Sequence, residues 1–345
     1  MVQISRMIRR VGGKVVGVFL RGRRLCRNSG SATEGRPYRS ASIEQTGGLG
    51  AIGDRITAMT NQNPNQLSAI ATFRELHASG CFVLPNPWDA GTSIYLQHLG
   101  FKALATTSAG FAFSRGLADS VSAVSRDLML AHIGDIVAAT PLPVNADFQT
   151  GYADEPEGVA ESVTLCVATG VAGLSIEDAR ETGIGDEVTA PLYEFELAVE
   201  RIKAARAAID ASGIPVLLTA RCEAWLVGQP DPFNESLKRL VAFAEAGADC
   251  LYAPGVSKPE EIEAIVKVVS PRPVNVLVSR FNSELTLAQL ADLGVRRVSV
   301  GSALACAAWG GFMRAAREMA ESGSFNAFSD AAAYAEINGL FAKQG

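Results

Sequence analysis

The residues best suited to chemistry are two acids and one arginine. Each stands at the end of a different apolar segment of the chain. Asp147 and Glu177 each end an apolar run, and Arg221 ends a third. Carboxylates that share a cleft repel one another unless a cation lies among them. A hard divalent cation such as Mg²⁺ would bind one or two carboxylates directly and the others through water. Arg221 could then pair with an anionic substrate, because its planar fork matches a carboxylate or a phosphate.

Small residues that follow two further apolar runs could hold a second anionic group. Residues 107–110 read TSAG, and Gly301 and Ser302 precede a helical segment, so both places can offer backbone N–H groups. A metal ion, an arginine and backbone amides together suit a small 2-oxo or 2-hydroxy acid. The metal would bind the oxo and carboxylate oxygens and stabilise the enolate formed when a bond to the neighbouring carbon breaks.

These residues need a scaffold that brings strand ends together, and the chain shows a repeated strand-then-helix pattern. Eight short apolar segments are candidate strands: 81–86, 103–108, 143–148, 173–178, 215–221, 250–254, 274–279 and 297–302. Helical patterns lie between them, at 120–140, 155–170, 193–213 and 235–249 among others. Strands that are apolar on both faces and alternate with helices indicate a parallel sheet.

Two architectures fit this pattern, and we favour the (β/α)8 TIM barrel. An open doubly wound sheet normally has a glycine-rich phosphate turn after its first strand, whereas the turn here reads NPWDAG. In a barrel the carboxyl ends of all eight strands meet at one mouth, where the chemistry takes place. The residues named above would therefore converge. The Ala-rich tail, 303–323 and 331–345, is expected to be helical and to pack on the barrel or on a neighbouring subunit.

Composition and charge exclude several classes of protein. The chain has 345 residues, 48% of them hydrophobic, and its longest apolar run is far shorter than a membrane span. The six cysteines form neither a CxxC pair nor a cluster with histidine, so we expect no structural zinc site, and scattered, mostly reduced cysteines fit an intracellular enzyme. Residues 1–40 hold ten of the 31 basic residues and one of the 36 acidic ones. The rest of the chain has 21 basic and 35 acidic residues, which is a net charge of −14. Such an acidic body argues against nucleic acid as a partner.

The basic N-terminal segment, residues 1–60, leaves the cellular location of the protein open. Residues 1–60 are rich in Arg, Ser and Gly, which is typical of a mitochondrial transit peptide, although we favour an inert, disordered extension. We expect a cytoplasmic protein, or a mitochondrial one if this segment is a transit peptide. The expected organisation is an extension over 1–60, a catalytic barrel over 61–310 and a helical tail over 311–345.

Several motifs, in their order along the chain, resemble those of the isocitrate lyase/phosphoenolpyruvate mutase superfamily. They are PVNADFQTGYAD (143–154), VAGLSIEDA (171–179), LLTAR (217–221) and FAEAGADCLYAPG (243–255), and the segment 84–112 extends the resemblance to about residues 66–310. The resemblance implies a Mg²⁺-dependent barrel, with Mn²⁺ as a possible substitute, that makes or breaks C–C or P–C bonds beside a 2-oxo acid. It also implies a homotetramer whose dimers swap the eighth helix.

The resemblance also assigns expected roles to individual residues. Asp147 matches the direct metal ligand, and Gln149, Asp119 and Glu177 match the positions that hold metal-bound waters. Arg221 matches a substrate-binding arginine, and it and Glu177 are the expected catalytic residues. The remaining expected substrate contacts are Thr107, Ser108, Ala109 and Asn275.

Two departures from the family pattern leave the reaction open. Gln149 stands where the family has a carboxylate, which weakens the expected metal site without removing it. The loop 179–194 has none of the Lys, Cys or His residues that the lyases and phosphonopyruvate enzymes carry there, and Asp186 and Glu187 are its only carboxylates well placed to move a proton. We expect C–C cleavage of a small 2-oxo or 2-hydroxy carboxylate. The alternatives are P–C chemistry on phosphonopyruvate-like substrates and a non-catalytic, metabolite-binding member.

Other chemically able residues have simpler interpretations. Asp178 is expected to fix the following loop, and Cys222 to be a small buried residue. The histidines His77, His98 and His132 fall within helical patterns, away from the strand ends, so we expect them in the core or on the surface. Glu223 could support Arg221.

Overall fold

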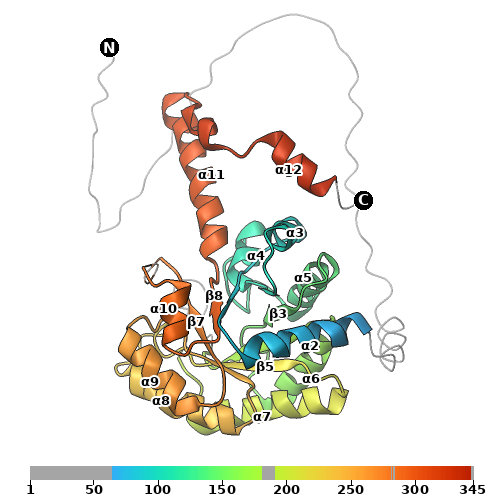
Figure 1. Ribbon diagram of the computed structural model, residues 1–345, viewed down its shortest axis with the longest axis vertical. Coiled ribbons are helices and arrows are strands. Elements are labelled where there is room, and N and C mark those ends of the chain that lie inside the picture. The colour runs from blue at the N-terminus through green and yellow to red at the C-terminus, as the bar shows by residue number, and fades with distance from the viewer. Residues whose placement is uncertain (1–63, 181–190, 281, 283, 343–345) are drawn as a thin grey trace, which may run out of the picture. The chain divides into compact units, whose positions relative to one another are not determined.

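The protein forms one sheet of eight parallel strands that curves into a nearly closed barrel surrounded by helices (Figure 1). The structure, a computed structural model, describes residues 64–180, 191–280, 282 and 284–342. The predicted (β/α)8 barrel is confirmed. The predicted extension or transit peptide over 1–60 lies outside the described residues. In the part of the chain that the structure describes, no helix is both long enough and apolar enough to cross a membrane.

All eight predicted strands are present, each shorter than its apolar segment. They are β1 (Phe82–Leu84), β2 (Leu104–Ala105), β3 (Val144–Asp147), β4 (Gly173–Glu177), β5 (Leu217–Arg221), β6 (Cys250–Tyr252), β7 (Val274–Leu277) and β8 (Arg297–Ser299). Hydrogen-bonded neighbours follow the order β1-β8-β7-β6-β5-β4-β3-β2. Between β2 and the end of β1, the Ala105 N–H donates to the Pro85 carbonyl at 3.0 Å. Backbone contacts therefore run round the whole barrel.

Helices surround the strands, and those that precede residue 303 bury side chains against them, whereas the tail helices bury only Ala305. They are α2 (Pro64–Ala78), α3 (Ala90–His98), α4 (Ser108–Ser114), α5 (Arg126–Ala138), α6 (Pro156–Ala168), α7 (Phe195–Ser212), α8 (Pro232–Glu245), α9 (Pro259–Val269), α10 (Leu287–Asp292), α11 (Ala303–Ser322) and α12 (Tyr334–Phe341), with a 3₁₀ turn, η3 (Asn326–Asp330). On α6 and α8, Val159, Val163, Leu240 and Phe243 are fully buried. Removing such side chains from water is the main force that holds helices on the sheet.

Local sequence signals explain where the helices begin. Helix α5 starts at residue 126, later than predicted, because the Ser125 side chain accepts the N–H of Leu128 and caps it there. Helix α8 starts at residue 232, earlier than predicted, because Asp231 caps it and Pro232 suits the first helical position. Helix α11 runs unbroken from residue 303 to residue 322, so the predicted boundary at 310 falls inside a helix.

A polar layer crosses the barrel interior near the amino ends of the strands. Arg297, at the start of β8, is 2% exposed, and its Nε donates to Asn275 Oδ1 at 2.9 Å. Its Nη2 donates to Thr219 Oγ1 at 3.0 Å, and its Nη1 lies 3.3 Å from Nε2 of His77 on α2. Of the histidines, His77 and His132 are buried and His98 is exposed, which confirms that they are core or surface residues.

Candidate active site

Three carboxylates surround the guanidinium of Arg221 at the carboxyl ends of β3, β4 and β5. Arg221 Nη1 lies 2.8 Å from Asp147 Oδ1, and Nη2 lies 3.2 Å from Glu177 Oε2. Its Nε donates to Glu223 Oε1 at 2.9 Å. Glu177 and Arg221 are register partners on neighbouring strands, so the sheet itself fixes their proximity. The structure thus brings together the predicted Asp147, Glu177 and Arg221.

The loop after β2 contacts the same aspartate. The Ser108 N–H donates to Asp147 Oδ2 at 2.9 Å, and the Asp147 N–H donates to Thr106 Oγ1 at 2.9 Å. Thr107 caps α4 by accepting the Gly110 N–H at 3.2 Å. A Cβ at residue 110 would lie 2.7 Å from Thr107 Cγ2, so only glycine permits this tight turn. The turn places Ser108 against Asp147, with Ala109 next along α4.

The site carries more negative charge than Arg221 balances. Burial raises the pKa of Glu177 well above its usual range, Arg221 opposes the rise, and Glu223, Asp147 and Asp119 add to it. Burial also raises the pKa of Glu223, against the effect of Arg221. Burial would lower the pKa of Arg221, but these acids raise it well above its usual value. Four carboxylates thus act on one another, and three of them contact the single guanidinium.

The loop after β3 reaches the site in a strained conformation. Gln149 and Tyr152 have φ angles of 48° and 59°, which non-glycine residues rarely adopt, and Gly151 between them has a φ of 78°. Each such non-glycine residue costs roughly 1–3 kcal/mol and persists where its surroundings enforce it. Tyr152 Oη donates to Gln149 Oε1 at 2.7 Å, and Gln149 Nε2 donates to Asp119 Oδ1 at 3.3 Å. The predicted Gln149 and Asp119 therefore contact each other.

These contacts settle which way the Gln149 amide faces. An ionised carboxylate only accepts hydrogen bonds, so Asp119 requires the NH₂ group of Gln149, and the amide oxygen is left to face Tyr152. Burial, with Asp147, Glu177 and Asp119, raises the pKa of Tyr152 far above its usual value, so its hydroxyl stays protonated and donates. One of the two lone pairs of the Gln149 oxygen is thereby used.

Asp178 and Cys222 support the site without facing Arg221. Asp178 Oδ1 accepts the Glu223 N–H at 2.8 Å, and Oδ2 lies 3.2 Å from Arg239 Nη1. Cys222 is fully buried, and Ser236 Oγ donates to its Sγ at 3.4 Å. Cys222 is thus the small buried residue that we expected, whereas the Asp178 carboxylate holds the segment after β5 and Arg239 of α8, not the loop that follows it. By fixing the backbone of Glu223, Asp178 also helps to orient the Glu223 carboxylate on Arg221.

Asn275, a predicted substrate contact, lies in the barrel interior. It is 1% exposed, its Nδ2 donates to Ser299 Oγ at 2.9 Å, and its Oδ1 accepts from Arg297. Both ends of its amide thus serve the polar layer below the mouth. Its role toward substrate stays a prediction.

Two residues that we did not assign to the site touch its components. The Tyr252 ring lies under Arg221, with the guanidinium carbon 5.1 Å from the ring centroid. Tyr252 ends β6 and is the register partner of Arg221. Its place at a strand end is the sequence feature that could have assigned it to the site. Arg201 on α7 is 1% exposed and donates to carbonyls of the loop after β3. Arg201 lies in a helix with an ordinary amphipathic pattern, so its sequence context did not indicate that it contacts the site.

The ends of the loop that departs from the family pattern are held firmly. Ala179 and Leu192 form an antiparallel bridge, and Arg180 and Tyr193 both contact Asp154, at 2.5 and 2.7 Å. Residues 181–190 lie outside the described residues, and so do Asp186 and Glu187, the predicted proton-transfer candidates.

The donor set fits a hydrated divalent ion better than a closed metal cage. Within residues 64–180 and 191–342 as described, no three His, Cys, Asp or Glu side chains are arranged to hold a metal ion. The acids at the mouth nevertheless offer only oxygen atoms, and their mutual repulsion would fall if a cation entered. Mg²⁺ usually keeps several waters and takes one or two carboxylates, so a sparse oxygen site of this kind suits it.

Comparisons with known proteins agree with this geometry. A family model described as phosphoenolpyruvate phosphomutase matches residues 73–320. The 2,3-dimethylmalate lyase of Eubacterium barkeri is 30% identical over 206 residues, which are 59% of this chain and 69% of that protein. A solved structure of a candidate lyase/mutase from Burkholderia cenocepacia J2315 is 48% identical, with a TM-score of 0.75 over 81% of this chain and 98% of that chain.

A third comparison is with a ligand-bound structure. Oxaloacetate acetylhydrolase in complex with the product oxalate is 25% identical, with a TM-score of 0.70 over 81% of this chain and 95% of that chain. The match of the family model to most of the chain, together with the barrel and the acids around Arg221, leads to one conclusion: the chain belongs to the isocitrate lyase/phosphoenolpyruvate mutase superfamily.

Proposed function

We propose that this protein is a Mg²⁺-dependent carbon–carbon lyase that acts on a small 2-oxo or 2-hydroxy carboxylate. The observation that carries the proposal is the guanidinium of Arg221, held within 3.2 Å of Asp147, Glu177 and Glu223 at the barrel mouth. The names of two relatives support it, since 2,3-dimethylmalate and oxaloacetate are both small dicarboxylates.

Arg221 would bind the substrate carboxylate. Its three nitrogens all contact acids, so binding requires that it exchanges at least one of these partners for the substrate. Asp147 is the natural partner to give up, because the exchange leaves its oxygens available to a cation. Glu223, the least exposed of the three acids, would stay on Nε and keep the guanidinium oriented.

Asp147 would hold Mg²⁺ directly, and Glu177, Gln149 and Asp119 would contact its bound waters. When bound, the ion supplies stabilisation of the negative charge that develops on the oxo-acid oxygen. Gln149 can still accept from a water through the second lone pair of its oxygen, because Tyr152 uses only one. Thr107, Ser108 and Ala109 would face the second anionic end of the substrate.

A screen of oxo and hydroxy acids for pyruvate or glyoxylate release, with Mg²⁺ and with chelator, tests the proposal. We expect release from at least one acid, and only with the metal. Phosphorus NMR on a phosphonate panel tests the P–C alternative, which the description of the matching family model favours. Stabilisation by oxalate and Mg²⁺ without turnover of any acid would overturn the lyase and support a metabolite-binding member.

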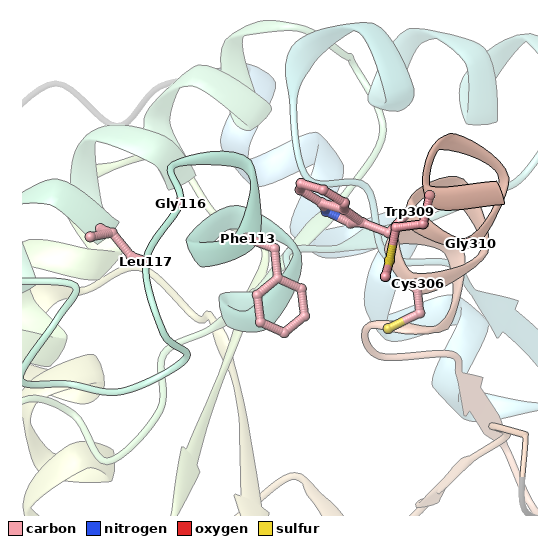
Figure 2. A pocket seen from close by; sticks show the side chains of 7 residues that line it. Phe113, Gly116, Leu117, Cys306, Trp309 and Gly310 are labelled. Atoms are coloured by element: carbon pink, nitrogen blue, oxygen red, sulfur yellow. The ribbon is translucent and has the colours of Figure 1, made fainter. Parts of the chain in front are cut away.

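We further propose that the protein is a homo-oligomer, as the tetramer of the resemblance implies. An apolar groove of about 490 Å³ lies between Phe113 and Leu117 on one side and Cys306, Trp309, Gly310 and Met313 of α11 on the other (Figure 2). Phe312, on the same helix, is 63% exposed and stacks edge-on against Trp309. One chain thus offers both an apolar groove and an apolar ridge, which is what a self-complementary contact between two copies requires.

A further inference from the structure

Arg201 is a buried cation that bonds to backbone carbonyls instead of to a carboxylate. It lies on α7, is 1% exposed, and donates through Nη1 to the carbonyls of Ala153 and Asp154, the latter at 2.6 Å. Its Nη2 donates to the carbonyl of Thr150. All three acceptors belong to the loop that joins β3 to α6. A guanidinium that is removed from water normally pairs with an acid, so this use of a buried charge calls for an explanation.

The loop that Arg201 grips is the strained one at the barrel mouth. Gln149, Gly151 and Tyr152 all have positive φ angles, of 48°, 78° and 59°. The carbonyl of Gln149 also accepts the N–H of Glu177 at 3.0 Å, so the loop is hydrogen-bonded to the end of β4. A backbone in this conformation relaxes unless contacts outside the loop hold it. The three carbonyl bonds from Arg201, which lies on α7, are such contacts.

Arg201 also contacts the chain segment that follows β4. Its guanidinium carbon lies 4.0 Å from the centroid of the Tyr193 ring, and the Tyr193 hydroxyl donates to Asp154 Oδ1 at 2.7 Å. The backbone of Tyr193 is fixed as well, because its N–H donates to the Asp178 carbonyl at 2.8 Å. The Arg201 side chain therefore contacts both the β3–α6 loop and Tyr193, which lies just before α7.

We propose that Arg201 is a positioning residue of the active site, which holds the β3–α6 loop in its strained conformation so that Gln149 and Tyr152 stand beside Asp147 and Glu177. The inference rests on the proposed function for its effect on Mg²⁺ and turnover. Its structural part, the restraint of the loop, does not. Removal of Arg201 releases the loop, withdraws Gln149 from the metal waters and leaves Asp147 and Arg221 in place.

The test compares variants of two arginines on the same helix. Arg201→Met removes the donors and keeps an unbranched apolar side chain, whereas Arg201→Lys restores one donor. The matched control is Arg206→Met, since Arg206 is also partly buried on α7 but pairs with Asp210 and Asp249, away from the loop. Tyr193→Phe, which keeps the ring under Arg201 and removes the bond to Asp154, is a milder variant should Arg201→Met not fold.

Hydrogen exchange in the metal-free protein reads the loop directly. The amides of Gly151, which donates to the Phe148 carbonyl, and of Glu177 are the reporters. We expect both to exchange faster in Arg201→Met, less so in Arg201→Lys and Tyr193→Phe, and at the wild-type rate in Arg206→Met. Equal protection of these amides in Arg201→Met and wild type would overturn the inference, whatever the protein catalyses.

Metal binding and kinetics then separate positioning from mere stability. Loss of a residue that supports a metal site typically weakens metal affinity or activity by about 10- to 100-fold. We expect Arg201→Met to show that loss in the Mg²⁺ midpoint of thermal stabilisation and in kcat, with little change in the substrate KM, and Arg201→Lys to recover part of it. A matching loss in Arg206→Met would assign the effect to stability and refute the positioning role. Absence of Mg²⁺ binding and turnover in the wild type would refute the proposed function and leave the exchange result to stand alone.

Discussion

Asp147 Oδ1 lies 2.8 Å from Arg221 Nη1, so the aspartate expected to bind a metal ion is ion-paired with the arginine expected to bind substrate. Both side chains are mostly buried, with exposed fractions of 18% and 14%. Each residue satisfies the charge of the other, which limits the cost of holding both charges away from water. Binding of a cation and of an anion together would replace this pair by two new ones without leaving either charge unpaired.

Replacement of Asp147 by asparagine is expected to abolish metal-dependent behaviour. Residues that only support a metal ligand contribute about 10- to 100-fold, so loss of the ligand itself should lower turnover by more than about 100-fold. Stability should change little, because Arg221 keeps Glu177 and Glu223 and the repulsion among the acids falls. Turnover assays and thermal melts with oxalate and Mg²⁺ measure both effects. Asp210→Asn, which alters an ion pair on α7, is the control. Intact Mg²⁺-dependent turnover in Asp147→Asn would contradict the assignment.

Replacement of Arg221 by lysine tests whether geometry or charge matters at this position. Three different nitrogens of Arg221 contact three acids, and a single ammonium group cannot reproduce that arrangement. We expect the substrate KM to rise by about tenfold or more, equivalent to about 1.4 kcal/mol of binding free energy. Steady-state kinetics measure it, with far-ultraviolet circular dichroism as the check on folding. A KM equal to that of the wild type would mean that the substrate needs only a positive charge there.

How much of this site could be foreseen depends on how each residue is held. Asp147, Glu177 and Arg221 end strands, and once eight strands are recognised the barrel forces their ends together. Arg201 and Tyr252 could not be foreseen in the same way, since one acts through backbone carbonyls of a distant loop and the other through a ring face. The inward position of Asn275 depends on the length of β7 and on its bonds to Arg297 and Ser299, which no local pattern reveals.

Two glycine-to-alanine substitutions should change stability in opposite directions. A Cβ at residue 173, at the start of β4, would lie 2.7 Å from both Asn145 Oδ1 and Phe73 Cε1, which are buried. We expect Gly173→Ala to lower the free energy of unfolding by about 1–3 kcal/mol, the usual cost of overpacking. In Gly134→Ala, within α5, the new Cβ meets nothing within 4 Å. We expect that substitution to add roughly 0.5–1 kcal/mol, because glycine is unfavourable inside a helix. Urea unfolding of both variants tests the pair, and equal stabilities would contradict the packing described here.

Protonation of His77 should destabilise the protein at low pH. Its Nδ1 lies 2.7 Å from the Phe73 carbonyl, so Nδ1 carries the proton, and Nε2 faces Arg297, which can only donate. Burial and Arg297 lower the pKa of His77 from 6.5 to about 3. The folded state therefore binds the proton less tightly than the unfolded state. The stabilisation is complete above pH 6.5 and is lost as the pH falls toward 3.

The size of this effect can be measured by urea unfolding at two pH values. Between about pH 8 and about pH 5 the His77 contribution should fall by about 2 kcal/mol. In His77→Gln, whose side-chain oxygen can still accept from Arg297, that part of the pH dependence should vanish. A wild-type curve and a variant curve of the same slope over this range would show that His77 is not the responsible group.

Substitution of Phe312 by glutamate should break the proposed contact between copies. Phe312 is 63% exposed beside the groove lined by Trp309 and Met313, and burial of a phenylalanine contributes about 1.5–3 kcal/mol. A charge placed in a self-complementary interface occurs on both sides of it, so each copy carries the penalty and the contact is lost. Light scattering after size exclusion should show the wild type as an oligomer and Phe312→Glu as a smaller species. Val268→Glu, at an exposed valine of α9, should leave the assembly unchanged. A wild-type protein that is monomeric at high concentration would instead leave the α11 groove without a second copy to fill it.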